Sequence, residues 1–134
     1  MLFKAEFVTK SGDTLSIETG KHNVPASDGR RTILSNHMAI MLPLRLGVIE
    51  TLNNGLHYYV VDEGILYFED NYAKILTDNF AEVAEIRIDE VNGKLEETEL
   101  IFNEAEDNLV KISAKKQLGW YRELKEAYNR YKKN

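Results

Sequence analysis

Three histidines, His22, His37 and His57, are the residues of this sequence best suited to acid–base chemistry or to binding a metal ion. No two of them have the close helical spacing of a zinc site, and the chain has no cysteine to supply a thiolate ligand. His37 follows the adjacent pair Arg30 and Arg31 and lies between apolar stretches. It is therefore a candidate catalytic residue, metal ligand or docking residue, although an isolated histidine is more often a packed or loop residue.

Other catalytic patterns are absent from the sequence. No serine lies in a G-x-S-x-G elbow, and there is no G-x-x-x-x-G-K-[ST] loop to cradle phosphates. The acid pairs Asp62-Glu63 and Glu69-Asp70 fall in predicted turns, where solvated carboxylates are the usual explanation. The residue types therefore favour binding or assembly over catalysis.

The composition predicts a soluble, intracellular globular protein. With 134 residues the chain fits one domain, or one domain with a small appendage, and a hydrophobic fraction of 43% is enough for a core. The net charge of −5 disfavours nucleic acid as a partner, because phosphate binding requires clustered Lys and Arg. No apolar run reaches the roughly 18 residues that span a bilayer, and the first residues lack the apolar segment of a signal peptide.

Residues 1–86 have the pattern of short strands, since Phe3, Ala5 and Phe7 alternate with more polar neighbours. Short strands separated by frequent turns predict an antiparallel sandwich or barrel. The turn signals are Ser11-Gly12-Asp13, Asn53-Asn54-Gly55 and Asp70-Asn71, of which the Asn-Gly pair predicts a hairpin between residues 48–52 and 56–61.

From residue 87 to residue 134 the apolar period becomes helical. We expect a first helix with Asp89 as its N-cap and a second helix from Ser113, joined by residues 108–112 as an antiparallel hairpin. The apolar stripe of the first helix is predicted to contain Val91, Leu95, Thr98, Phe102, Ala105 and Leu109, and that of the second Trp120, Leu124, Ala127 and Tyr131.

The two predicted helices have opposite charge. Residues 89–107 contain eight acids and one lysine, a net charge of −7, whereas residues 115–133 contain seven bases and two acids, a net charge of +5. Either the two helices are solvated and attract each other, or the basic helix also has an acidic partner elsewhere. Exposed ion pairs contribute only about 0–1 kcal/mol each, so a hairpin with one narrow apolar seam could open. The bases are Lys115, Lys116, Arg122, Lys125, Arg130, Lys132 and Lys133.

Four stretches are similar, in this order, to segments of one known family: FVTKSG (7–12), GRRTILSNH (29–37), LRLGVI (44–49) and YVVDEGILYFEDNYAKILTDNFAEVAEIRID (59–89). Together with a β domain followed by a helical hairpin, they resemble the epsilon subunit of F-type ATP synthases over nearly the whole chain. The resemblance implies an α+β fold, with an N-terminal antiparallel β-sandwich in residues 1–86 and a C-terminal antiparallel helical hairpin in residues 87–134.

The resemblance also implies a function: a non-catalytic rotor subunit of the central stalk, held peripherally on the cytoplasmic face of the membrane by its complex. In this family the sandwich binds the gamma subunit and the membrane rotor ring, and the basic second helix meets the catalytic beta subunits and restrains ATP hydrolysis. The interface residues implied here are Arg30, Arg31, His37 and Met38, and the inhibitory residues are Lys115, Lys116, Arg122, Lys125 and Arg130.

The sequence departs from the family pattern in the loop that contains His37. Arg30, next to Arg31, replaces the usual loop acid, so we expect an acidic partner surface at this point. In an alternative interpretation, Arg31 covers a tyrosine ring of a nearby strand. Further departures from the family pattern are Thr32, Ser35 and Glu63.

The family's ATP motif, I-D-x-x-R-A, is also incomplete. Ile88 and Asp89 remain, but Asn92 and Gly93 replace the Arg and Ala. An amide lacks the charged donors with which a guanidinium meets phosphate oxygens. We therefore expect no cofactor, and weak or absent ATP binding.

Two other functional classes stay open at the level of sequence. The first is a stand-alone β-sandwich module that binds a small ligand or a sugar, and the second is an enzyme with an unrecognised site. A rotor subunit would co-purify in fixed stoichiometry with a gamma-like protein, whereas a binding module would be a monomer saturated by a small molecule.

Overall fold

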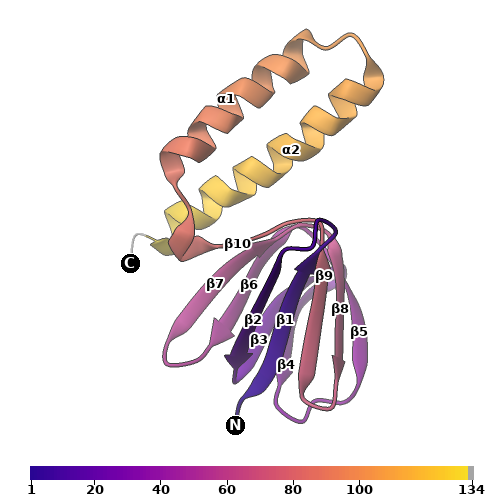
Figure 1. Cartoon of the computed structure of the whole chain (residues 1–134), viewed down its shortest axis with the longest axis vertical. Helices are drawn as coiled ribbons and strands as arrows, with labels where there is room; N and C mark the ends of the chain where they lie inside the picture. The colour runs from indigo at the N-terminus through magenta and orange to yellow at the C-terminus, as the bar shows by residue number, and fades with distance from the viewer. Residues whose placement is uncertain (133–134) are drawn as a thin grey trace. The chain divides into compact units, whose positions relative to one another are not determined.

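A computed structural model describes residues 1–132 of the chain. It contains a β-sandwich followed by a helical hairpin, which confirms the predicted α+β fold class (Figure 1). The chain divides into two compact units, Met1–Glu82 and the part from Val83 onward, and each is described here by itself. Neither helix of the described range is long and apolar enough to cross a membrane.

The first unit is a single ten-stranded sheet folded into two layers. Its order is β10-β7-β6-β3-β5-β8-β9-β1-β2, and β4 pairs with β3. All pairings are antiparallel except that of β1 with β9, which no local sequence pattern predicted. The strands are β1 (Phe3–Thr9), β2 (Thr14–Thr19), β3 (Lys21–Ala26), β4 (Gly29–Leu34), β5 (Ile40–Leu44), β6 (Gly47–Leu52), β7 (Leu56–Val61), β8 (Gly64–Glu69), β9 (Tyr72–Thr77) and β10 (Phe80–Glu82).

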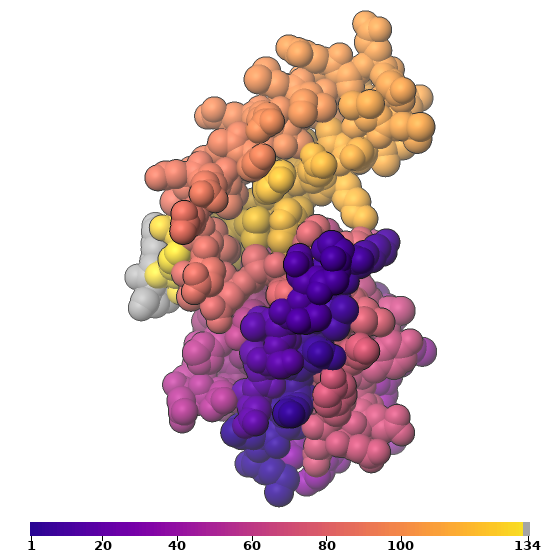
Figure 2. All heavy atoms as spheres, in the orientation of Figure 1, coloured from indigo at the N-terminus to yellow at the C-terminus, as the bar shows by residue number. Residues whose placement is uncertain are grey.

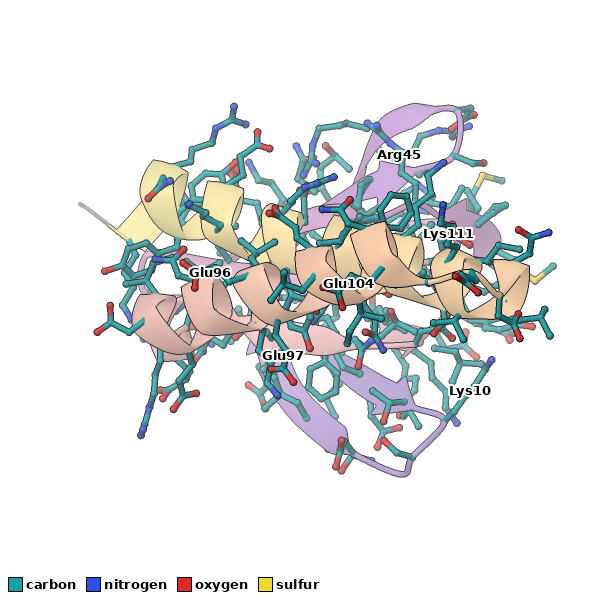
Figure 3. The ribbon with its side chains drawn as sticks, turned by 90° about the horizontal axis from the view of Figure 1, so that it is seen from above. Lys10, Arg45, Glu96, Glu97, Glu104 and Lys111 are labelled. Atoms are coloured by element: carbon teal, nitrogen blue, oxygen red, sulfur yellow. The ribbon has the colours of Figure 1, made fainter. Side chains whose placement is uncertain are left out.

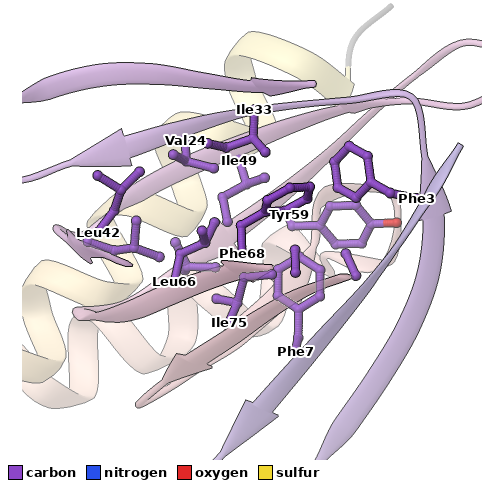
Figure 4. Packing of buried hydrophobic residues seen from close by; sticks show 14 residues of the cluster. Phe3, Phe7, Val24, Ile33, Leu42, Ile49, Tyr59, Leu66, Phe68 and Ile75 are labelled. Atoms are coloured by element: carbon purple, nitrogen blue, oxygen red, sulfur yellow. The ribbon is translucent and has the colours of Figure 1, made fainter. Parts of the chain in front are cut away.

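The core lies between the two layers and is rich in aromatic side chains (Figure 4). Phe7 is completely buried, with its ring centroid 5.2 Å from that of Tyr59, and Phe3 meets Phe68 edge-on at the same distance. Alternate residues of β1, β8 and β9 enter this core, as the period of a strand requires.

Residues at positive φ close the strand connections. The predicted hairpin between β6 and β7 is confirmed: Leu52 pairs with Leu56, and Asn54 and Gly55 have φ of 53° and 119°. The turn between β8 and β9 is built in the same way from Asp70 and Asn71, with φ of 51° and 59°. Asparagine, aspartate and glycine tolerate this region best, so the sequence located these turns correctly.

His22 on β3 is an unusual member of the sandwich core. It is fully buried, its ring meets Phe3 and Phe7 edge-on, and neither ring nitrogen has a hydrogen-bond partner in residues 1–132. Burial lowers the pKa of His22 to about 4, because the charged ring would lose its hydration without gaining a partner. The most deeply buried histidine is therefore a neutral core residue.

The second unit is the hairpin, whose helices differ from the predicted ones at both N-termini. α1 (Ile88–Glu104) follows a short 3₁₀ turn, η1 (Val83–Glu85), and its N-cap is Arg87, not Asp89 as predicted. α2 (Asn108–Ala127) begins five residues before Ser113, because the Asp107 side chain accepts a hydrogen bond from the Leu109 N–H at 2.7 Å and caps the helix there. A π-helical turn, η2 (Tyr128–Lys132), follows α2.

The seam between α1 and α2 is narrow. It buries Val91, Leu95 and Thr98 of α1, as predicted, against small and medium side chains of α2. The stripe predicted beyond Phe102 is wrong, since α1 ends at Glu104 and Leu109 is an exposed residue of α2. The buried residues of α2 are Ala114, Leu118, Leu124 and Ala127.

Candidate functional site

The loop that contains His37 lies at one end of the sandwich, between β4 and β5. Asn36 has φ of 65°, and Asn71 holds it in place: the Asn71 Oδ1 accepts from the Asn36 N–H at 2.6 Å, and the Asn71 Nδ2 donates to the Asn36 Oδ1 at 3.0 Å. Segments 36–39 and 69–71 surround a polar hollow of about 370 Å³. The two connections thus form one ordered surface.

His37 is a half-buried member of this surface. Its Nδ1 lies 2.7 Å from the Met38 carbonyl oxygen, and its ring meets the core residue Phe68 edge-on at 6.0 Å. Met38 is 75% exposed. No group of three or more His, Cys, Asp or Glu side chains suited to a metal ion exists in residues 1–132. The geometry therefore suits docking, with His37 anchoring the loop and Met38 presented to a partner.

Arg30 lies on β4 and crosses the sheet. Its Nε donates to the Asn23 Oδ1 at 2.6 Å, and its Nη2 donates to the carbonyl oxygens of Asn23 and Val48 at 2.9 and 2.8 Å. These bonds connect β4 with β3 and β6. The side chain is an ordered cation of the sheet, a role that its position in a loop-like motif did not reveal.

Arg31, the next residue, pairs with Asp28 across the tight turn between β3 and β4. The Arg31 Nη2 lies 2.8 Å from the Asp28 Oδ2. The hydrogen bond from Arg31, with its charge, lowers the pKa of the exposed Asp28 carboxyl. Because Asp28 offsets one of the two arginines, the turn carries less positive charge than the sequence suggested.

The outer face of the sheet formed by β5, β8, β9 and β1 carries apolar side chains that the sequence analysis did not single out. Met41, Ile65, Tyr67 and Leu76 are all exposed on paired positions of neighbouring strands. An apolar hollow of about 350 Å³ lies at one end of this face, between residues 8–10, 63–65 and 76–78. We call these four side chains the outer apolar face.

A signal for the outer apolar face was present in the sequence. Ile65 to Phe68 is a continuous apolar run, and such a run predicts a strand that is covered on both faces. Beside it, the Tyr72 hydroxyl donates to the Glu6 Oε1 at 2.8 Å, which raises the pKa of Tyr72 because ionisation would remove the proton of this hydrogen bond. The rim of the outer apolar face is thus polar and ordered.

The basic residues predicted to be inhibitory lie on α2 and η2, and each of the five is exposed. Arg122 lies 3.9 Å from Glu99 of α1, and Arg130 lies 3.7 Å from Glu126. The Lys132 Nζ donates to the Ile86 carbonyl oxygen at 2.6 Å and so connects the end of the hairpin to its beginning. The five are Lys115, Lys116, Arg122, Lys125 and Arg130; Lys133 lies outside the described residues.

The residues of the incomplete ATP motif begin α1. Asp89 is exposed in the first turn, Ile88 is half-buried, and Asn92 lies one turn further on. The Asn92 Oδ1 is buried without a hydrogen-bond donor in the described part of the chain. The position thus offers a carbonyl acceptor and an exposed carboxylate, which do not match the negative oxygens of a phosphate.

A two-layer sandwich with an ordered loop surface and an outer apolar face, followed by a hairpin of opposite charges, favours the class of docking and assembly proteins over enzymes. Residues 2–83 match the family described as ATP synthase, Delta/Epsilon chain, beta-sandwich domain. The chain belongs to this family, as an epsilon-type accessory subunit that is not itself an enzyme.

Relatives with the name ATP synthase epsilon chain support the assignment. The chain is 31% identical to that of Pelagibacter ubique over 99 residues, which cover 72% of this chain and 76% of the relative. It is 28% identical to that of Ureaplasma parvum over 120 residues, which cover 87% and 88%. The similarity therefore extends beyond the sandwich into the hairpin.

Solved structures share the fold at low sequence identity. A chain of the Euglena gracilis mitochondrial ATP synthase matches with a TM-score of 0.70 and 18% identity, over 92% of this chain and 79% of that one. A chain from the central stalk and c-ring structure of Tetrahymena thermophila matches with a TM-score of 0.55 and 14% identity, over 93% and 95%. The chain thus shares its fold with chains of these two mitochondrial ATP synthase structures.

Proposed function

We propose that this subunit joins the gamma subunit to the membrane rotor ring in the central stalk, on the cytoplasmic face of the membrane. The outer apolar face carries this proposal, because contiguous exposed apolar side chains mark protein interfaces. The gamma subunit would cover Met41, Ile65, Tyr67 and Leu76, and the ring would meet the loop surface at His37 and Met38.

The gamma contact is tested by replacing Tyr67 and Leu76 with serine, since both side chains are exposed and neither change opens a core cavity. We expect co-purification with the gamma subunit to fall by about tenfold or more. Leu34, which is as exposed but lies outside this face, supplies the matched control Leu34→Ser. Retention of gamma by the double variant would contradict this placement of the interface.

The ring contact has a separate test at the arginine pair. We propose that the ring surface opposite is acidic, so Arg31→Glu should weaken binding to the ring, more at low salt than at high salt. Arg31 is the better probe, because Arg30 also bonds to backbone carbonyls of β3 and β6. Tighter binding by the Arg31→Glu variant would mean that the ring surface is basic.

We further propose that the basic helix restrains ATP hydrolysis by meeting acidic segments of the catalytic beta subunits. Removal of residues 110–134 should raise hydrolysis by the assembled complex while the subunit stays bound. A triple change of Lys115, Arg122 and Lys125 to glutamine isolates the charge, because these side chains are exposed and glutamine is a good helix former. Equal hydrolysis in all three complexes would remove the regulatory part of the proposal.

Nucleotide binding by the isolated subunit is proposed to be weak or absent, since Asn92 supplies no cation for phosphate. Titration of ATP into the purified chain should give no saturable signal below millimolar concentration. The variant Asn92→Arg, which restores the family residue, is the informative comparison. Tight ATP binding by the unchanged chain would show that other residues replace the missing guanidinium.

The alternative of a stand-alone module for a small ligand is decided by one purification from native extract. The polar hollow beside His37 is the site such a ligand would occupy. A stoichiometric complex with a gamma-like protein and nucleotide-binding subunits supports the rotor subunit. A monomer that is saturated by a small molecule supports the alternative.

A further inference from the structure

The end of the hairpin at which α1 is connected to α2 has no buried residue. Residues 99–113, here called the hairpin tip, comprise the last turns of α1, the connection and the first turns of α2. The tip nevertheless contains large exposed apolar side chains, with Leu109 at 76% and Ile112 at 65% exposure. The full set of these exposed side chains is Leu100, Ile101, Leu109, Val110 and Ile112.

Helices in proteins derive most of their stability from burying one apolar face. The hairpin does this only in the part nearer its ends, where Leu95 and Leu118 are buried, whereas at the tip Phe102 is only half-buried. The tip, orange in Figure 2, presents its side chains at the surface. Apolar side chains that lie on both helices and are not buried in the seam are typical of a binding site.

The charges around the tip identify the kind of partner. The tip contains four acids and one base, Lys111, which gives it a net charge of −3. Figure 3 shows Glu96, Glu97 and Glu104 spaced along α1. The Lys111 Nζ lies 5.7 Å from the Phe102 ring centroid. The apolar side chains of the tip therefore lie in a segment in which acids outnumber bases.

We propose that the hairpin tip binds a cationic amphipathic helix of a partner protein, whose apolar face covers Leu109 and Ile112 and whose lysines or arginines meet the acids of α1. Two other occupants fit the charges less well. A second copy of the chain that bound tip to tip would oppose carboxylates to carboxylates, and an anionic membrane surface would be repelled in the same way.

This site is distinct from the inhibitory surface proposed above, which is basic and lies further along α2. The hairpin would thus offer two surfaces of opposite sign to two different partners. Because the tip can be studied on the purified chain without the ATP synthase complex, its test does not depend on the proposed function.

The experiment uses the full chain, labelled with ¹⁵N, and a synthetic helical peptide of about five turns with leucine on one face and lysine on the other. We expect amide shifts concentrated in residues 99–113. The double variant Leu109→Ser, Ile112→Ser should weaken peptide affinity by about tenfold or more, and Glu104→Gln with Glu106→Gln should weaken it and reduce its salt dependence. The control Leu34→Ser, Leu56→Ser, which changes two exposed apolar side chains of the sandwich, should bind as the unchanged chain does.

Several results would overturn the proposal. They are shifts centred outside the tip, equal affinity of the serine double variant, equal binding of a leucine–glutamate peptide, and absence of binding at millimolar peptide. Self-association in sedimentation that the serine variant abolishes would assign the tip to a second copy, and binding to anionic vesicles would assign it to a membrane. A lower melting temperature of the serine variant would show that the tip is covered within its own chain.

Discussion

The sandwich and the hairpin are stabilised in different ways. Phe7, Ile75 and Val61 of the sandwich are completely buried among aromatic and branched neighbours, and the sheet pairs strands that are distant in sequence. The hairpin buries one narrow seam of smaller side chains, and its described ion pairs are exposed and long. We therefore expect the sandwich to be the more stable of the two units and the hairpin the less stable one.

The strongest test of this difference is Gly64→Ala at the start of β8. A Cβ at this position would overlap the carbonyl oxygen of Leu76 on the paired strand β9, and backbone cannot move aside as a flexible side chain can. We expect a loss of at least about 3 kcal/mol in the free energy of unfolding, or no folded sandwich at all. This free energy is measured by denaturant unfolding, followed by far-UV circular dichroism.

The matched control is Gly20→Ala, between β2 and β3. The closest atom to a Cβ there is the Leu52 carbonyl oxygen at 3.6 Å, an ordinary contact. This variant should lose less than about 1 kcal/mol. If both variants had equal stability, the close packing inferred for β8 and β9 would be incorrect.

A second test acts on the sandwich through pH. The pKa of His22 is about 4 in the folded protein and 6.5 when unfolded, so the unfolded chain binds more protons between these values. Above pH 6.5 the ring is neutral in both states and the free energy of unfolding is not reduced by His22. As the pH falls from 6.5 to 4, protonation of the unfolded chain lowers this free energy. The loss should reach about 3 kcal/mol, which unfolding curves at pH 7 and pH 4.5 largely capture.

The variant His22→Leu separates this effect from the titration of carboxylates, which occurs in both proteins. Leucine fills a similar volume between Phe3 and Phe7 and cannot be charged. The stability difference between the two proteins should therefore grow as the pH falls. If the difference stays constant from pH 7 to pH 4.5, a partner or a water molecule must stabilise the charged His22 ring in the folded protein, so that its pKa is not lowered.

The sequence predicted the sandwich in detail because its turns are local. Asn54, Gly55 and Asn71 mark backbone with positive φ, and the alternation in β1 identifies the face that is buried. The parallel pairing of β1 with β9 escaped prediction, because residues nearly 70 positions apart leave no local pattern. The bonds of Arg30 to Asn23 and Val48 could not be foreseen either, because they depend on which strands lie side by side.

The hairpin was predicted in kind but not in its boundaries. A helical period identifies a helix, but its ends depend on single capping groups, and the period alone does not distinguish the cap Asp107 from the acids of the first helix. The candidate site shows a similar division. His37 was a candidate from its residue type and Met38 from a resemblance, whereas the outer apolar face and the hairpin tip required knowledge of which apolar side chains remain uncovered.

A third test acts on the hairpin alone, through its cap. In Asp107→Ala the Leu109 N–H loses its acceptor, and the free energy of unfolding the hairpin should fall by about 1 kcal/mol. Hydrogen exchange of α2 amides measures this locally, because the sandwich would dominate a global melting curve. Asp107→Asn keeps an oxygen in place and should restore most of the protection; failure to do so would point to the charge at the helix N-terminus instead.

The smallest effect is expected from Gly93→Ala, and it has the opposite sign. Gly93 is exposed inside α1, and no atom lies within 4 Å of a Cβ at this position. Alanine should therefore stabilise the hairpin by about 0.5–1 kcal/mol, because it restricts the unfolded chain and favours the helix.

In the β1–β2 turn, Gly12 has equal space but a φ of 94°, so Gly12→Ala should destabilise the sandwich by a similar amount. Amide exchange in α1 about threefold slower for Gly93→Ala, beside faster exchange in β1 for Gly12→Ala, would support a hairpin that is limited by helix propensity and a sandwich that is limited by backbone geometry. Unchanged exchange in α1 would instead mean that the seam with α2, and not the helix itself, sets the stability of the hairpin.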